Sequence, residues 1–352
     1  MMPEARPRVA AVLLKWHGEQ RSEAAHDALL HPLADSLDFT VFGVEWGQSP
    51  PLSQLAGRFD AVVFLQTQPP ARLVRELACP VTWIPMWDSV RARPDSWWRR
   101  LPSALRIVAF SDQIARRARM AGLTMLSLCY GCDPASVEPA TWDNGRVALY
   151  WNRTGLASPA FIEQFCAALR VDQLLYKNQL DPGFGPKALL KLPVRIGSTQ
   201  VTEIPHTERR DDYFALIRPA NILLAPRAAE GIGMTFLEAL ARGCAVFACD
   251  RPTMNEVIES GVNGVLLPLE TTPALVAGEW RMEHKSRRML ARFGVVGSGP
   301  LEVFSTAVDW AALAALDLER IGERARLSQA GGVLRWRASL PAYARFLLGG
   351  EG

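Results

Sequence analysis

Four residues that could hold a phosphorylated ligand lie close together in the second half of the chain: Glu230, Gly231, Gly233 and Glu238. The apolar run 221–225 predicts a buried strand, and 234–242 predicts a helix closed by Gly243. A glycine-rich turn would therefore open a helix, where backbone N–H groups and the positive end of the helix dipole favour an anion. The pattern indicates a diphosphate cradle, although an isolated Gly-x-Gly is more often an ordinary structural turn.

The two carboxylates lie on either side of this cradle. Glu230 is in the loop before the predicted helix, and Glu238 is in its second turn. Carboxylates accept hydrogen bonds from hydroxyl groups, so one would suit a ribose and the other a hexose, with the glycines holding a pyrophosphate between them.

The first half of the chain alternates short apolar runs with helix-like stretches, which is typical of a parallel sheet covered on both faces. Helices are expected at 22–37, 71–78 and 111–121, the last with Ser111 as its N-cap. The predicted strands are 8–15, 39–44, 60–66, 81–86, 106–110 and 125–128.

A polar, proline-containing stretch at 133–145 indicates a linker, after which a second α/β series begins. This series is predicted to contain strands at 147–151, 194–197 and 221–225, and helices at 159–169 and 211–217. The spacing of apolar residues in 331–350 predicts a closing amphipathic helix. We therefore expect three parts: a doubly wound domain at 1–140, a second at 141–330, and the closing helix at 331–352.

Composition limits the classes of function. The 352 residues carry a net charge of only +3, and the positive side chains are mostly arginines, which suit phosphorylated small molecules better than nucleic acid. No apolar run reaches the roughly 18 residues that a membrane span needs. The apolar run 9–14 is too short for a signal-peptide core, so we expect a cytoplasmic protein.

Six cysteines leave two interpretations open. Cys129 and Cys132 are closely spaced, and with Cys244 and Cys249 they could form a four-thiolate zinc site. Reduced thiols packed as small apolar side chains are the favoured interpretation, because Cys244 and Cys249 fit a buried strand.

The order of elements around the cradle resembles a known family. The series Glu230-Gly231-Ile232-Gly233-x4-Glu238, the strand 245–248 and the segment 255–266 are similar to the C-terminal domain of family 4 glycosyltransferases of the GT-B fold. Weaker similarities lie at 126–134, 149–153 and 320–346. The resemblance implies two Rossmann-like doubly wound domains facing a cleft, with the last helix packing back on the fold.

The resemblance also implies a set of donor-binding residues for a nucleotide-diphosphate sugar. Glu238 would bind the ribose, and Glu230 would act on the transferred sugar. Backbone groups of Gly231, Ile232, Gly233 and Met234 would hold the diphosphate, Arg153 would face it, and Ile204 would lie near the base. The family is usually retaining and metal-independent, and this sequence has no Asp-x-Asp pair that would hold a divalent cation, so no metal cofactor is expected.

The sequence departs from the family pattern at several places. Family members commonly place a lysine a few residues after the arginine, but 154–159 contain none. Lys177, Arg227 or an arginine of the first domain could replace it, or the site could be weaker. In the first domain, His17 and Gly18 follow the first strand, and His17 has the alternative of a solvated loop histidine. Asp88 is a candidate catalytic residue facing the cleft or, equally, a helix N-cap.

We therefore expect transfer of a hexose from a nucleotide-diphosphate sugar to a glycan or lipid-linked glycan, with bacterial cell-surface polysaccharide synthesis as the setting. A degenerate GT-B protein that binds a sugar nucleotide or a partner transferase without turnover is the alternative, and a sugar-nucleotide epimerase is a third reading. Trp97 and Trp98 beside several arginines could form a peripheral membrane or glycan contact at the inner face of the membrane, or could simply pack.

Overall fold

The computed structural model describes residues 5–15, 28–179, 190–205, 207, 210–225, 227–271 and 302–351. The chain divides into two compact units. The first contains the described residues up to Tyr130 together with those from Leu334 onward, and the second contains those from Gly131 to Val333. The first unit changes to the second after Tyr130, whereas the boundary was expected at 140.

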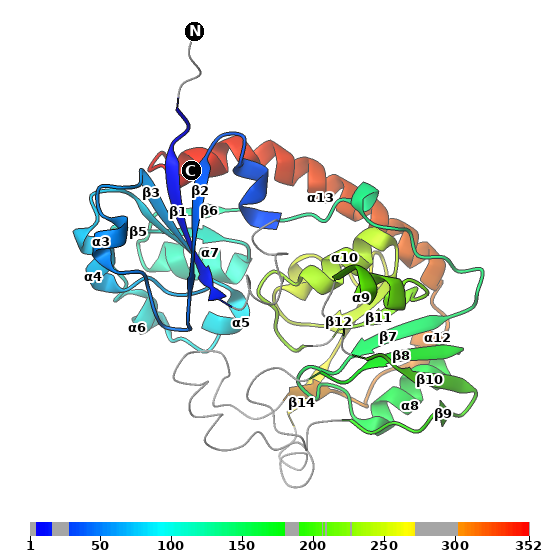
Figure 1. Ribbon diagram of the computed structural model, residues 1–352. Helices are drawn as coiled ribbons and strands as arrows, with labels where there is room; N and C mark the ends of the chain where they lie inside the picture. The colour runs from blue at the N-terminus through cyan, green and yellow to red at the C-terminus, as the bar shows by residue number, and fades with distance from the viewer. Residues whose placement is uncertain are drawn as a thin grey trace. The chain divides into compact units, whose positions relative to one another are not determined.

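The first unit is built on a six-stranded parallel sheet in the order β2-β1-β3-β4-β5-β6 (Figure 1). Its central strand β3 consists entirely of apolar residues buried on both faces, which explains why the apolar run predicted it well. The strands are β1 (Arg8–Leu14), β2 (Asp38–Val44), β3 (Ala61–Leu65), β4 (Val81–Ile84), β5 (Leu105–Ala109) and β6 (Met125–Ser127).

Short helices connect these strands: α3 (Leu52–Leu55), α4 (Ala71–Glu76), α5 (Trp87–Val90), α6 (Asp95–Trp98) and α7 (Asp112–Met120). The predicted N-cap is confirmed, because the hydroxyl of Ser111 accepts a hydrogen bond from the amide of Gln113. The helix predicted at 22–37 is wrong in its last part, where a 3₁₀ turn, η1 (His31–Leu33), is present instead. Pro32 lacks the N–H that a continuing α-helix would need there; residues 22–27 lie outside the described part.

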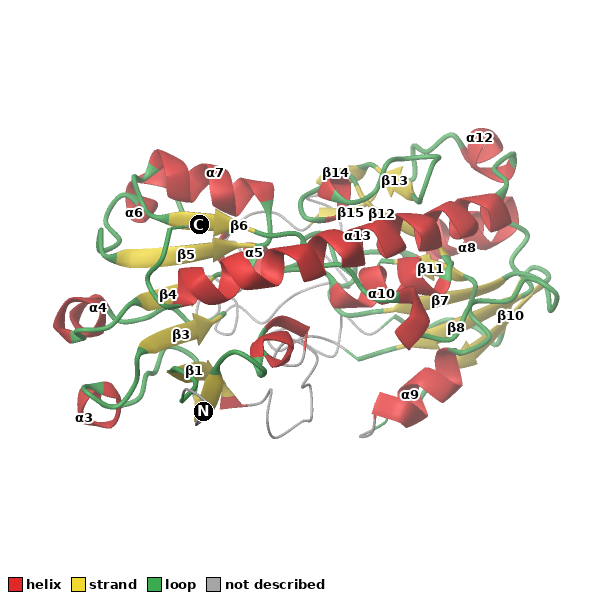
Figure 2. Ribbon diagram, turned by 90° about the horizontal axis from the view of Figure 1, so that it is seen from above, coloured by secondary structure: helices red, strands yellow, loops and turns green. Residues whose placement is uncertain are grey.

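The second unit has a seven-stranded sheet in the order β13-β12-β11-β7-β8-β10-β9, parallel except for β9 (Figure 2). Three of its strands, β8, β10 and β13, were not predicted from the sequence. The strands are β7 (Val147–Trp151), β8 (Gln173–Lys177), β9 (Arg195–Ile196), β10 (Thr199–Glu203), β11 (Ile222–Leu224), β12 (Ala245–Cys249) and β13 (Val265–Leu267).

The remaining elements of this unit are the helices and a small hairpin. Strands β14 (Leu269–Thr271) and β15 (Glu302–Phe304) pair antiparallel. The helices are α8 (Pro159–Ala168), α9 (Arg210–Ile217), α10 (Met234–Arg242) and α12 (Trp310–Ala314), with 3₁₀ turns η2 (Pro134–Ser136) and η4 (Met254–Glu256). Helix α10 has the predicted bounds, and Gly243 closes it with a left-handed φ of 85°.

The last helix, α13 (Leu318–Leu347), begins well before the predicted start at 331. Its first half packs within the second unit, where Gly322 lies so close to the carbonyl of Gly243 that a Cβ would not fit. Its second half belongs to the first unit, where the Trp336 ring lies 5.8 Å from that of Phe110. Arg106 closes the C-terminal end by donating to the carbonyls of Phe346 and Gly350.

Candidate functional site

Strand β7 is the topological switch point of the second unit. The chain continues from β7 to β8 on one side, and returns later to place β11 on the other side. Because these strands are parallel, their carboxyl ends meet at one edge of the sheet, which is where open α/β sheets bind ligands. The predicted residues of this unit follow these strand ends: Arg153 after β7, Ile204 after β10, and Glu230 to Glu238 after β11.

The turn between β11 and α10 brings a cation and a carboxylate together. Glu230 is buried, with 7% of its surface exposed, and its Oε2 lies 3.7 Å from Nη1 of Arg227. The carbonyl of Arg227 in turn accepts a hydrogen bond from the thiol of Cys249 at the end of β12. A buried carboxylate needs such compensation, so the turn holds Glu230 in a defined place at the edge of the sheet.

Gly233 is the N-cap of α10 and has a left-handed φ of 82°. A Cβ at this position would lie 1.7 Å from the ring of Phe236, so only glycine fits. The cap provides no side-chain acceptor for the first N–H groups of the helix. Those groups and the positive end of the helix dipole lie where β11 leads into α10, a position that would favour an anion. Gly231 and Ile232 are buried in the same turn, whereas Met234 and Glu238 are half-buried on α10.

A buried polar network shapes the loop after β7. Asn152 is fully buried, and its Oδ1 accepts hydrogen bonds from the amide of Gly155 at 3.0 Å and the hydroxyl of Tyr150 at 3.5 Å. Its amide nitrogen donates to Oδ1 of Asn178 at 2.9 Å. This network fixes the path of residues 152–155, which carry Arg153. The sequence indicated Asn152 only as part of the family resemblance, and Asn178 was missed because β8 was not predicted.

Two cations contact one indole ring at the ends of β7 and β8. Trp151 and Lys177 are register partners, and the Nζ of Lys177 lies 4.3 Å from the centre of the Trp151 ring. The guanidinium of Arg153 lies 4.7 Å from the same ring centre. Lys177 is only 5% exposed, and burial together with the positive charge of Arg153 lowers its pKa to about 8.

Ile204 follows β10 at the same edge. Its side chain is buried, and its amide donates to the carbonyl of Tyr176 at 2.7 Å. That bond continues the β8–β10 pairing by one residue, so the amide of Ile204 is already hydrogen-bonded within the sheet. A contact of this residue with a nucleotide base would therefore use its carbonyl.

In the first unit, Asp88 lies in the first turn of α5, just after the carboxyl end of β4. The N-cap of α5 is Met86, with no side-chain cap, so the alternative reading of Asp88 as an N-cap is wrong. The carboxylate of Asp88 accepts a hydrogen bond from the hydroxyl of Ser89 at 3.2 Å. His17 and Gly18 lie outside the described residues.

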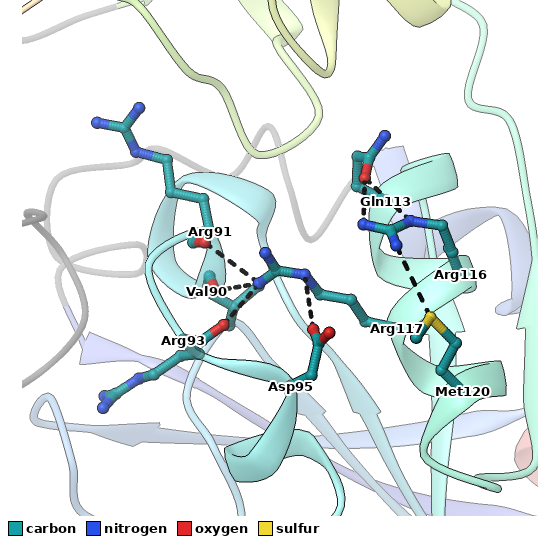
Figure 3. A network of polar contacts seen from close by, with 8 residues as sticks. All are labelled: Val90, Arg91, Arg93, Asp95, Gln113, Arg116, Arg117 and Met120. Carbon is teal, nitrogen blue, oxygen red and sulfur yellow. Dashed lines mark hydrogen bonds and ion pairs between the residues drawn. The ribbon is translucent and has the colours of Figure 1, made fainter.

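Arg117 of α7 holds the segment that follows α5 (Figure 3). Its Nη1 donates to the carbonyls of Val90, Arg91 and Arg93 at 3.3, 3.2 and 2.8 Å. The guanidinium also lies 3.9 Å from the carboxylate of Asp95 and 4.9 Å from the ring centre of Trp87. Burial lowers its pKa. One largely buried side chain therefore fixes the loop beside Asp88.

Trp98, Cys244 and Cys249, which the sequence analysis singled out, are buried. Trp98 is 1% exposed and stacks on Trp83, and Trp97 contacts both of these rings. Cys244 and Cys249 are buried with thiols that donate to backbone carbonyls. Within the described ranges there is no group of three or more histidine, cysteine or acidic residues that could hold a metal. Nor does any helix in that part of the chain combine the length and apolarity needed to cross a membrane.

Comparison with solved structures identifies the architecture. HepE (Alr3699) of Anabaena, solved in complex with UDP, matches with a TM-score of 0.57 and 16% identity over 97% of this chain and 99% of that chain. The sucrose-phosphate synthase of Thermosynechococcus elongatus matches with a TM-score of 0.56 and 13% identity, over 97% and 98% of the two chains. The fold is GT-B. This confirms the predicted fold class.

One more solved structure and one family model also match this chain. WaaG, a glycosyltransferase involved in lipopolysaccharide biosynthesis, matches with a TM-score of 0.54 and 14% identity over 97% of this chain and 100% of that chain. Residues 183–282 match the family model described as glycosyl transferases group 1. No curated protein sequence matches the chain. The family model and the GT-B neighbours together support a glycosyltransferase.

Proposed function

We propose that this protein is a retaining, metal-independent family 4 glycosyltransferase. In this proposal it transfers a hexose from a nucleotide-diphosphate sugar to a glycan or lipid-linked glycan, in bacterial cell-surface polysaccharide synthesis. The observation that carries the proposal is that Arg153, Glu230 and the α10 N-terminus follow the carboxyl ends of the adjacent parallel strands β7 and β11. In this proposal that edge combines an anion site with two carboxylates, Glu230 and Glu238, for hydroxyl groups.

Each residue has a proposed role at the donor. Glu238 binds the ribose hydroxyls, and Glu230 binds the hexose. The backbone from Gly231 to Met234 and the guanidinium of Arg153 hold the diphosphate, and the carbonyl of Ile204 lies near the base. Asp88, with His17 and Gly18, is proposed to act from the first unit. HepE was solved with UDP, with UDP and glucose, and with UDP-glucose, which makes uridine the first base to test.

The proposed step breaks the bond between the anomeric carbon and the outer phosphate oxygen, whose electron pair stays with the leaving diphosphate. The acceptor hydroxyl oxygen bonds to the anomeric carbon on the same face, and its proton passes to the departing phosphate oxygen. Charge accumulates on the diphosphate, so preorganised cations and helix N–H groups at that position lower the barrier. In this proposal Arg153 and the first turn of α10 take the part that a divalent cation has in metal-dependent transferases.

A binding screen tests the proposal directly. UDP, GDP, dTDP and their sugars are titrated calorimetrically and by thermal shift, without added metal, against wild type and Glu238→Ala. Glu163→Ala is the matched control, because Glu163 is an exposed helical glutamate on α8 of the same unit. Stabilisation by one nucleotide, lost in Glu238→Ala and kept in Glu163→Ala, supports the donor site. Absence of binding by every nucleotide refutes it, and tight binding without donor hydrolysis would favour the degenerate GT-B alternative.

A further inference from the structure

The second unit has a cavity at the sheet edge opposite the proposed donor residues. Arg146 immediately precedes β7 and Asp172 immediately precedes β8, so both lie at the amino ends of these parallel strands. Together with the loop before β7 and the start of α13, they line a cavity of about 640 Å³. This volume is typical of small-molecule sites, which span roughly 300–1,000 Å³. The proposed donor residues follow the carboxyl ends of the strands, so the cavity is a separate place in the same unit.

One wall of the cavity is an indole that the fold holds in place. Trp142 lies half-buried in the loop before β7. The buried amide of Asn221 donates to the carbonyls of Thr141 and Gly145 at 2.9 and 2.7 Å, which ties the loop on both sides of the tryptophan. The ring also packs against α13, because a Cβ on Gly322 would lie 3.5 Å from its Cζ2. The indole is therefore preorganised before any ligand binds.

Charged side chains of both signs line the rest of the cavity. They are two arginines and three carboxylates: Arg146, Arg170, Asp172, Asp317 and Glu319. Because the formal charges nearly cancel, the lining favours neither a phosphate nor a compact cation. A guanidinium only donates hydrogen bonds and a carboxylate only accepts them, whereas each sugar hydroxyl does both. This lining beside an aromatic ring matches a neutral saccharide, which has hydroxyl groups around apolar C–H faces.

Hydrogen bonds to the backbone fix several of these side chains. Nη1 of Arg146 donates to the carbonyl of Leu169 at 2.6 Å. Oδ2 of Asp172 accepts from the backbone amide of Arg146 at 2.8 Å. Oδ1 of Asp317 accepts from the amide of Arg320 at 3.1 Å, in the first turn of α13. The cavity is therefore built on defined ends of β7, β8 and α13.

Arg170 occupies a backbone position that favours glycine. It follows Leu169, the C-cap of α8, and has a left-handed φ of 50°. The amide of Val171 donates to the carbonyl of Cys166 at 2.9 Å, which completes a helix ending where glycine is the common residue. A side chain at this position costs stability that glycine would not cost. The exposed arginine nevertheless lines the cavity, which points to a role outside the helix ending.

We propose that this cavity is a second, non-catalytic site that binds a neutral saccharide. Trp142 stacks on a sugar ring, while Arg170, Glu319 and the second carboxylate oxygen of Asp317 bind its hydroxyl groups. The inference goes beyond the proposed function, because it uses the opposite edge of the sheet and none of the donor residues. A glycan held here would stay on the protein whether or not a nucleotide is bound.

Calorimetry and saturation-transfer NMR with maltohexaose, cellohexaose and mannohexaose test the inference. We expect wild type to bind at least one of them. Trp142→Ala should weaken that binding about tenfold, because the stacking surface is lost. Glu319→Gln should weaken it about threefold or more. Glu163→Gln is the matched control, since Glu163 is an exposed glutamate on α8 and does not line the cavity. Circular dichroism of each variant checks that the fold is retained.

Arg170→Gly separates ligand binding from folding, because its two expected effects have opposite signs. The urea midpoint of unfolding should rise, since glycine adopts the left-handed backbone without a Cβ cost. Saccharide affinity should fall about threefold or more, since the guanidinium donor is lost. Wild-type affinity in Arg170→Gly, Trp142→Ala and Glu319→Gln would show that the cavity does not bind the saccharide.

Glu230→Gln distinguishes this cavity from the donor edge, because Glu230 is the residue proposed to bind the donor hexose. Its saccharide affinity should equal that of wild type. Loss of affinity in Glu230→Gln but not in Trp142→Ala would place the saccharide at the donor edge and overturn the inference. If wild type binds none of the three hexasaccharides, the inference is also wrong. The proposed function, which the nucleotide titrations test, would stand in either case.

Discussion

Glu230 and Arg227 face each other across a single turn at the end of β11, with 3.7 Å between Oε2 and Nη1. Both side chains are largely buried, so this ion pair is not an exposed surface salt bridge. It fixes the position of the Glu230 carboxylate. The turn then continues through two glycines into α10. A carboxylate, a cation and a helix N-terminus are therefore held within a few residues at the edge where β7 and β11 end.

Glu230→Gln should separate sugar recognition from nucleotide binding. In the proposed site this carboxylate contacts the hexose and not the nucleotide, so we expect kcat to fall by roughly a hundredfold or more. The Kd for the nucleoside diphosphate alone should change by less than about threefold. Steady-state transfer assays and calorimetry provide the two values, with Glu163→Gln as the control. Equal loss of nucleotide affinity and kcat would instead indicate a structural role in the turn.

Gly233→Ala should destabilise the protein. A left-handed φ of 82° is strained for any residue with a Cβ, and here the added atom would also collide with the ring of Phe236. We expect a loss of about 1–3 kcal/mol in the free energy of unfolding, measured in urea. Gly57→Ala is the matched control, since Gly57 has a φ of 67° and no atom within 4 Å of the added Cβ. A cost no greater than that of Gly57→Ala would contradict the clash.

Lys177→Met should stabilise the ligand-free protein at neutral pH. The folded-state pKa of about 8 lies below the ordinary lysine value of 10.5, so the folded state binds the proton less well than the unfolded state. Wild-type stability should therefore rise between pH 8 and 10 relative to that of Lys177→Met, which lacks this titration. Urea unfolding of both proteins at pH 7 and 9.5 measures the difference. Parallel pH profiles for the two proteins would show that Lys177 is not held in a costly charged state.

The sequence predicted elements where local pattern and tertiary context agree. Strand β7 and helix α10 have the predicted bounds, because the apolar run at 147–151 and the Gly233 and Gly243 caps mark their ends. Strand β8 was missed because its apolar core, Leu174 to Tyr176, is short and is flanked by the polar residues Gln173 and Lys177. Because β8 was not predicted, the register pairing of Trp151 with Lys177 could not be predicted either. Lys177 was therefore only one of several candidates to replace the lysine that family members carry after the arginine.

Other errors have the same origin in tertiary packing. The start of α13 was placed too late, because Leu318 and Ile321 gave no continuous apolar stripe with the later residues. These side chains are nevertheless buried in the second unit, and Gly322 allows close contact with Gly243. The hydrogen bonds of Asn152 and of Arg117 also join segments far apart in the sequence, so spacing alone could not predict them.

Arg117→Met should loosen the segment between α5 and α6. The Arg117 guanidinium donates hydrogen bonds to three backbone carbonyls in this segment. These carbonyls lose their charged donor when the guanidinium is removed. The amides of Arg91 and Arg93, which donate to the carbonyls of Trp87 and Val90, should then exchange with solvent at least about tenfold faster. Hydrogen exchange with mass spectrometry or NMR measures this effect.

Arg116→Met is the control for this change, because Arg116 precedes Arg117 on α7 but is exposed and bonds only within the helix, to Gln113 and Met120. Exchange in the 87–95 segment should be unchanged in that variant. If Asp88 acts on the reaction, Arg117→Met should also lower kcat, since Asp88 lies at the start of the loosened segment. Faster exchange with unchanged kcat would remove Asp88 from the proposed catalytic residues, and unchanged exchange would mean that Arg117 does not hold this segment.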